Sequence, residues 1–333
     1  MRYNFCTYFD SNYLARGLAL YHSLKKHCQD FRLWVLCMDE DSYAALSRMK
    51  LSGMELIALK DFEKGDSGLE KARKDRIRIE YYFTCTPSLV LFILNSFLDV
   101  DLITYIDADL YFFADPRPLF EEMRDNSIAI IPHRFSSRNK RNLIFGIYNV
   151  GWLSFRRDEN GLKCLMRWRE LCNEWCYERV EDNKFADQKY LDNWPGDFKG
   201  VAVLETKGAD VAPWNVTNYK LCVAKDNVTV DGDTLVFFHF HAFRHLFWRV
   251  YSTGLSIYKA RPDKVIRDYI YKPYLGALLE ADKDLSEACG KRLCARNIRI
   301  QRSSSFLKRF CQTIKRPLDI IFKIIIYGDF IVA

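Results

Sequence analysis

The chain has 333 residues, enough for one large α/β domain or two modest ones, and 49% of its residues are hydrophobic against 28% charged. No run of 18 apolar residues occurs, which argues against a membrane-spanning helix. The net charge of +7 favours anionic partners such as nucleotide diphosphates or acidic lipid, but no nucleic-acid-binding module is recognisable, so we expect no nucleic-acid partner.

The N-terminal sequence predicts alternating strands and helices. Residues 3–9, 31–38 and 54–59 are strand-like, and helical apolar spacing links them over 14–26 and 40–50. This order predicts a mixed, mainly parallel sheet flanked by helices, a Rossmann-like α/β fold. In such sheets, ligands bind at the carboxyl ends of the strands.

The middle of the chain continues the pattern. We expect a polar loop over 61–75, then helix over 76–98 with a break at Pro87. Further predicted strands are 102–106, 127–131, 148–155, 201–204 and 234–240, and predicted helices are 161–179 and 184–193.

The C-terminal part differs in composition. We expect a domain over 1–265, followed by a helical, basic and amphipathic extension over 266–333. Its stretch 305–333 fits either an anionic membrane surface or a helix docked on the domain. The eleven cysteines form no CxxC pair and no leader precedes residue 3. We therefore expect reduced thiols and a cytoplasmic protein, peripheral to the inner membrane face if the tail binds there.

The chemistry is predicted to centre on Asp107 and Asp109, which follow the apolar run 102–106. Two carboxylates this close repel one another unless a cation lies between them. A hard divalent ion with oxygen ligands suits such a pair and can bridge to a diphosphate.

Four motifs resemble the GT-A glycosyltransferases, specifically the retaining family 8, which includes glycogenin and lipopolysaccharide galactosyltransferases. They are residues 5–13 with the helix that follows, 105–110, 149–151, and Asp187-Gln188. The likeness covers roughly residues 1–245, and residues 145–148 and 214–215 look typical of a divergent bacterial branch.

The resemblance implies a glycosyltransferase, a hexosyltransferase that moves a sugar from a nucleotide-diphosphate donor with retention of configuration. It implies Mn²⁺ or Mg²⁺ at Asp107, Asp109 and a late histidine, either His239 or the preferred His241. It places Asp187 and Gln188 at the catalytic centre and gives the donor these contacts: Thr7, Tyr8, Asp10, Arg78, Asp107, Ala108, Asn149, Gly151 and Arg244.

The chain also departs from the family pattern. An arginine expected near residue 83 is absent, and Arg73, Arg76 or Arg78 are candidates to replace it. The basic stretch 133–147 predicts a phosphorylated or lipid-linked saccharide acceptor, hence surface polysaccharide or lipopolysaccharide synthesis. Two alternatives stay open: a non-catalytic nucleotide-sugar-binding scaffold, and a sugar nucleotidyltransferase, although residues 8–12 lack the glycines that the latter needs.

Overall fold

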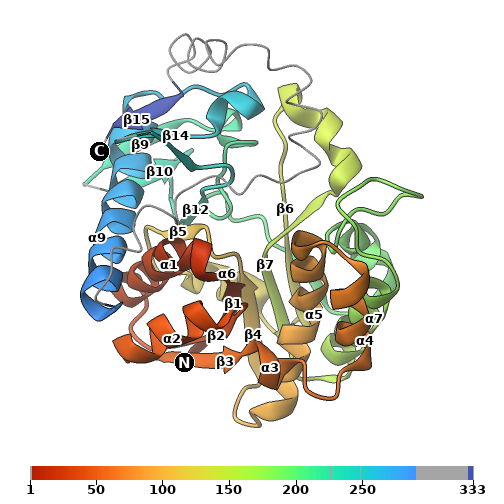
Figure 1. Ribbon diagram of the computed structural model, residues 1–333. Helices are drawn as coiled ribbons and strands as arrows, with labels where there is room; N and C mark the ends of the chain where they lie inside the picture. The colour runs from red at the N-terminus through yellow and green to blue at the C-terminus, as the bar shows by residue number, and fades with distance from the viewer. Residues whose placement is uncertain (1, 226, 248, 290–328, 333) are drawn as a thin grey trace, which may run out of the picture.

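The computed structural model describes residues 2–225, 227–247, 249–289 and 329–332 (Figure 1). A seven-stranded sheet runs through it in the order β3, β2, β1, β4, β7, β6, β8. Its pairs are parallel except where β7 runs antiparallel to β4 and β6. The mixed, mainly parallel sheet predicted from the sequence is thus confirmed. The strands are β1 (Tyr3–Phe9), β2 (Phe31–Cys37), β3 (Met54–Ala58), β4 (Leu102–Ile106), β6 (Ile128–Pro132), β7 (Tyr148–Arg156) and β8 (Val201–Val203).

Helices cover both faces of the sheet because side chains alternate along each strand. On β1, Phe5 packs into one core and its neighbour Cys6 into the other. One face carries α1 (Leu14–His27), α2 (Glu40–Met49), α6 (Arg117–Met123) and α9 (Lys272–Cys289). The other carries α3 (Leu59–Phe62), α4 (Ser67–Asp75), α5 (Arg78–Ser96) and α7 (Glu159–Glu174).

Smaller elements surround the carboxyl ends of the strands. Three small sheets pair β5 (Leu110–Phe112) with β12 (Phe237–His239), β9 (Leu221–Ala224) with β10 (Asn227–Val230) and β11 (Asp233–Thr234), and β13 (Arg244–Phe247) with β14 (Val250–Ser252) and β15 (Phe330–Val332). Short helical turns are η1 (Ser11–Tyr13), η2 (Ser137–Phe145), η3 (Lys189–Asn193), α8 (Trp194–Asp197), η4 (Val216–Asn218), η5 (Leu255–Tyr258) and η6 (Ile266–Tyr271).

The prediction of a loop over 61–75 is wrong, because α4 occupies most of this stretch. The side chain of Asp66 accepts a hydrogen bond from the backbone N–H of Leu69 and caps the helix. Only Leu69 and Ala72 of this helix are buried. So narrow an apolar face in a polar segment gives a weak periodic signal.

The expected break at Pro87 is also wrong, since α5 continues through it to Ser96. Pro87 lies in a stretch that is buried on both sides, from Thr84 to Val90. The free energy gained by burying these side chains offsets the loss of the backbone hydrogen bond that a proline cannot donate within a helix. The other expected boundaries shift as well: α7 ends at Glu174, 184–193 is helical only from Lys189, and 234–240 divides into β11 and β12.

The C-terminal part packs against the sheet domain where it is described. Tyr274 of α9 stacks on Phe240 with 3.7 Å between ring centroids, and β15 pairs with β14. The boundary at residue 265 stays a prediction, and most of the stretch 305–333 falls outside the described residues. Among the described helices, none is both long and apolar enough to cross a membrane. The nine cysteines in the described part of the chain are free thiols.

Candidate metal and donor site

Asp107 and Asp109 lie where β4 leaves the sheet. All five residues of β4 are buried, so the strand position is fixed by apolar packing. The backbone N–H of Asp107 donates to the carbonyl of Gly151 at 3.2 Å, and the hydroxyl of Tyr105 donates to Asp107 Oδ1 at 2.8 Å. These contacts hold the first carboxylate at the carboxyl edge of the sheet.

His239 faces the two carboxylates from β12. This strand pairs antiparallel with β5, which places His239 opposite Leu110, one residue after Asp109. The imidazole Nε2 lies 3.1 Å from Asp109 Oδ1 and 3.7 Å from Asp107 Oδ2. One ligand atom from each of the three residues fits within 4.8 Å, so this group can hold a metal ion.

The preferred histidine of the sequence analysis, His241, is not in that three-residue group. Strand alternation puts residues 239 and 241 on one face, but β12 ends at His239 and the backbone turns at Ala242, where φ is +62°. The two imidazole centroids lie 6.1 Å apart, and His241 packs edge-on to Trp214. The structure therefore groups His239 with the carboxylates in place of His241.

Asp210, which was not predicted from the sequence, lies on the side of the His239 ring that faces away from Asp107 and Asp109. It is fully buried, and its Oδ1 lies 3.4 Å from Nδ1 of His239. The amide Nδ2 of Asn149 donates to both Asp210 oxygens, at 3.0 and 3.1 Å, and its Oδ1 accepts from Gly151 N. Asp210 lies in an irregular segment with a left-handed backbone (φ +52°), so no strand or helix periodicity marks it.

The two carboxylates differ in their proton affinity. Burial, reinforced by the charge of Asp109, raises the pKa of Asp107 to about 6 against the attraction of His239. Burial also acts to raise the pKa of Asp109, but the charge and hydrogen bond of His239 outweigh it and hold that pKa well below its ordinary value. A divalent cation between them would favour the charged form of both.

A second set of predicted residues lies at the end of the adjacent strand β1. Asp10 is buried and forms a short ion pair with Arg78 at the start of α5. Tyr82, one turn further along α5, donates to the same carboxylate at 3.1 Å. Since β1 and β4 are parallel neighbours, these groups share an edge of the sheet with Asp107.

Of the three arginines considered as replacements, only Arg78 reaches this edge. Arg76 is buried and donates to the carbonyls of Cys172 and Asn173, both at 2.6 Å, which gives it a structural role. Arg73 pairs with Glu63.

Thr7, Tyr8 and Asp187 lie between these two groups. Thr7 is fully buried and its hydroxyl has no hydrogen-bond partner among the described residues. The hydroxyl of Tyr8 is 3.3 Å from Thr86 Oγ1. Burial raises the pKa of Asp187 to about 7, the charge of Asp107 adds to that rise, and a hydrogen bond from Thr86 opposes it. A carboxyl with this pKa is about half neutral at pH 7 and can donate a hydrogen bond.

The remaining predicted residues occupy different positions. Ala108 is buried between the two carboxylates. Gly151 lies against the site, since a Cβ there would be 2.9 Å from Nδ1 of His239. Gln188 instead donates through Nε2 to the carbonyl of Phe145 at 3.0 Å. Arg244 begins β13, and its buried Nε has no hydrogen-bond partner within the described part of the chain.

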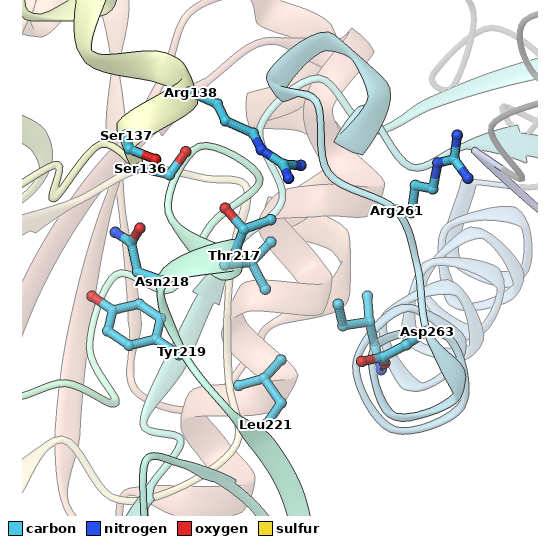
Figure 2. A pocket seen from close by; sticks show the side chains of 11 residues that line it. Ser136, Ser137, Arg138, Thr217, Asn218, Tyr219, Leu221, Arg261 and Asp263 are labelled. Atoms are coloured by element: carbon cyan, nitrogen blue, oxygen red, sulfur yellow. Dashed lines mark hydrogen bonds between the residues drawn. The ribbon is translucent and has the colours of Figure 1, made fainter.

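A separate hollow of about 440 Å³ lies beside η2 (Figure 2). Arg138 extends over it, with Arg261 on another side and Thr217, Asn218 and Tyr219 along its wall. Trp214 connects it to the metal group: its carbonyl accepts from Ser136 N, and its ring centroid is 5.0 Å from that of His239.

The chain is similar in sequence to two Bacillus subtilis (strain 168) proteins that are themselves described as uncharacterized. It is 30% identical to YfnD over 279 residues, which cover 82% of this chain and 88% of YfnD. It is 33% identical to YfnF over 248 residues, which cover 72% of this chain and 81% of YfnF. The chain therefore belongs to the family of YfnD and YfnF. No protein-family model matches the sequence.

Among solved structures, the chain is similar to the galactosyltransferase LgtC in complex with donor and acceptor sugar analogs. That likeness has 18% identity and a TM-score of 0.45 and covers 65% of this chain and 77% of LgtC. The glycosyltransferase GlyE of Streptococcus pneumoniae TIGR4 is 16% identical with a TM-score of 0.49 over 88% of this chain and 64% of GlyE. Donor, acceptor and stereochemistry have to be argued from the site itself.

Proposed function

We propose that this protein is a metal-dependent glycosyltransferase that moves a hexose from a nucleotide-diphosphate donor, a UDP-sugar, to a saccharide or lipid-linked acceptor. The observation that carries the proposal is the convergence of Asp107, Asp109 and His239 at the edge of the sheet that Asp10 and Arg78 share. Such an edge is where α/β sheets bind nucleotides.

The residues at the proposed metal position fit a divalent ion. Two carboxylates and one imidazole form a mixed oxygen and nitrogen set that suits Mn²⁺, and Mg²⁺ if water replaces the imidazole. A metal ion bound by Asp107, Asp109 and His239 would neutralise charge on the diphosphate leaving group. Asp210 and Asn149 would fix the orientation of the imidazole through its other nitrogen.

The nucleotide is proposed to bind along the end of β1. Thr7 offers a buried hydroxyl without a partner among the described residues, and the ring of Tyr8 lies 6.0 Å from that of Tyr82, so this edge of the sheet offers aromatic rings against which a base can pack. The guanidinium of Arg78 is half exposed and can turn from Asp10 toward a phosphate.

The sugar is proposed to contact Asn149, Gly151, Asp187 and Gln188. The reaction breaks the bond between the anomeric carbon and the phosphate oxygen, forms a bond to the acceptor oxygen, and moves the acceptor proton to the leaving phosphate. Asp187 is buried with a pKa of about 7, which suits a group that hydrogen-bonds and positions the sugar better than an ionised nucleophile. Attack from the face of departure would retain the configuration.

Two other functions compete with this one. A sugar nucleotidyltransferase would use a glycine-rich phosphate loop after β1, but that position holds Asp10-Ser11-Asn12, which begins η1. A non-catalytic scaffold needs no metal group, whereas here two partly buried carboxylates are kept beside each other at a cost in electrostatic repulsion.

Calorimetric titration of UDP with and without Mn²⁺ tests the proposal. We expect micromolar, Mn²⁺-dependent binding to the wild type that Asp109→Ala abolishes. Asp61→Ala removes an exposed carboxylate on α3 and should bind as the wild type does. Binding that is unaffected by Mn²⁺ or by Asp109→Ala would refute the metal-dependent site, and the configuration of the product, read by NMR, tests retention separately.

A further inference from the structure

The segment η2 and the residues after it place an unusual group of apolar side chains in solvent. Thirteen large hydrophobic side chains of the described residues are exposed, and four of them lie within five positions. Scattered exposed apolar residues are ordinary, but a contiguous group marks an interaction surface. We call this group the apolar tip: Leu143, Ile144, Phe145 and Ile147, exposed by 42, 52, 36 and 43%.

The backbone of the apolar tip is held by side chains of the neighbouring segment 188–192. Gln188 donates to the carbonyl of Phe145 at 3.0 Å, and Lys189 donates to that of Leu143 at 3.2 Å. The N–H of Ile147 donates to Asp192 Oδ1 at 2.6 Å, and Asp192 also pairs with Lys189. These bonds satisfy polar backbone groups that would be costly to bury in an apolar medium.

Gly146 supports the same arrangement. Its φ of +138° lies outside the range that other residues adopt readily, and a Cβ there would be 3.2 Å from Cγ of Gln188. The turn therefore presses the backbone onto residue 188, while the apolar side chains stay partly exposed and the ring of Phe145 packs against Phe185 with 4.7 Å between centroids. Because Gln188 is one of the proposed sugar contacts, the apolar tip borders the proposed donor site.

Cationic side chains flank the apolar tip. The stretch 133–147 contains no aspartate or glutamate, and Arg138, Lys140 and Arg141 are all exposed. Within the ranges that the structure describes, no ion pair joins these three to a carboxylate. Exposed apolar residues beside unpaired cations match the two parts of an anionic bilayer surface, acyl boundary and phosphate headgroup.

We propose that η2 and the apolar tip form a docking surface for an anionic phospholipid bilayer, which brings the mouth of the donor site to the lipid surface. The position of η2 fits this use, since it follows β6 and precedes β7 in the chain and its yellow-green ribbon lies at the upper right of the molecule (Figure 1). This inference rests on the proposed function only for its purpose, which is access to a lipid-linked acceptor. Bilayer binding itself requires no glycosyl transfer.

Co-sedimentation of the full chain with vesicles tests the proposal. We expect binding to vesicles of phosphatidylcholine with phosphatidylglycerol, and little to phosphatidylcholine alone. Ile144→Ser/Ile147→Ser should lower the partition coefficient at least roughly tenfold, since each change removes an apolar side chain from the contact. Leu98→Ser, at an apolar residue that is 81% exposed after α5, is the matched control and should not change it.

The electrostatic part has its own pair of variants. Lys140→Gln/Arg141→Gln should weaken binding to the anionic vesicles severalfold and make the remaining binding less sensitive to salt, because fewer cations contact the headgroups. Lys71→Gln/Lys74→Gln on α4 removes the same charge elsewhere and should have no effect beyond net charge. Failure of the wild type to bind, or equal losses in test and control variants, would overturn the proposal. So would dimerisation through the apolar tip, seen by light scattering without vesicles. Calorimetry with UDP distinguishes these outcomes from failure of the donor site.

Discussion

Asp210 supports His239 from the side opposite the metal group: its Oδ1 is 3.4 Å from Nδ1 of the imidazole, while Nε2 of the same ring faces Asp109 at 3.1 Å. A carboxylate in this position selects the tautomer in which Nε2 is free to bind a metal ion, and it fixes the orientation of the ring. The positioning of the third proposed ligand therefore depends on a residue that would never touch the metal.

We predict that Asp210→Asn lowers the apparent affinity for Mn²⁺ by roughly 10- to 100-fold, the effect typical of losing such a support. The affinity is measured by Mn²⁺ titration of UDP binding, which also reads metal binding without turnover. Because Asn keeps the size of the side chain, thermal unfolding without metal should change little. An unaltered Mn²⁺ affinity would show that Asp210 only fills space beside Asn149.

The buried carboxyl of Asp187 gives a pH-dependent prediction. Its pKa is raised to about 7 in the fold, so between pH 4 and 7 the unfolded chain loses a proton that the folded chain keeps. The folded state is therefore favoured at low pH, and this contribution is lost as the pH rises through the folded pKa, by up to about 4 kcal/mol.

The variant Asp187→Asn resembles the neutral carboxyl at every pH, so it should remove this pH dependence and with it the loss of stability at high pH. We expect urea unfolding at pH 8 to give a higher free energy of unfolding for the variant than for the wild type, and the difference to shrink toward pH 4. Asp107 titrates in the same direction in both proteins, and because its charge also raises the pKa of Asp187, the difference reports Asp187 together with this coupling. A difference that does not vary with pH would contradict the raised pKa.

The fold and half of the site follow from the sequence for a common reason. The apolar run 102–106 is too short for a typical helix and fits a fully buried strand, so the two aspartates after it are expected at a sheet edge, as the structure has them. Asp10 after β1 is predictable in the same way. Local pattern is sufficient wherever a strand is buried on both faces.

Other parts of the site depend on pairing that local pattern does not encode. His239 and His241 are equivalent by alternation, and only the pairing of β12 with β5 brings the first of them to Asp109. Asp210 lies in a turn with no periodic signal, 61 residues from its partner Asn149. In the sequence, the stretch 133–147 stands out for its basic residues, and hydrophobicity alone does not tell that the apolar tip lies in solvent.

The ion pair of Arg78 with Asp10 leads to a prediction about the nucleotide. If Arg78 turns to the diphosphate, Arg78→Gln should weaken UDP binding roughly 10- to 100-fold, the value of a charge-assisted contact. Calorimetry with Mn²⁺ present measures it. Arg73→Gln, which breaks an exposed pair with Glu63, is the matched control and should leave the affinity within twofold. Equal affinities for the two variants would place the phosphates elsewhere.

Close packing between β7 and His239 supplies the last prediction. A Cβ added at Gly151 would lie 2.9 Å from Nδ1 of His239, closer than real contacts allow, and 3.0 Å from Nδ2 of Asn149, which is a tight contact. Gly151→Ala must push the imidazole or the amide away from Asp210, and overpacking of this kind costs about 1 to 3 kcal/mol of stability. We expect Mn²⁺-dependent UDP binding to fall by more than the loss of stability explains, because the displaced group is the proposed metal ligand.

Gly196→Ala in α8 meets no atom within 4 Å and serves as the control in both urea unfolding and calorimetry. If Gly151→Ala loses stability but keeps full Mn²⁺ affinity, the strand has moved instead of the imidazole, and His239 is not held as tightly as its contacts with Asp210 and Asn149 imply.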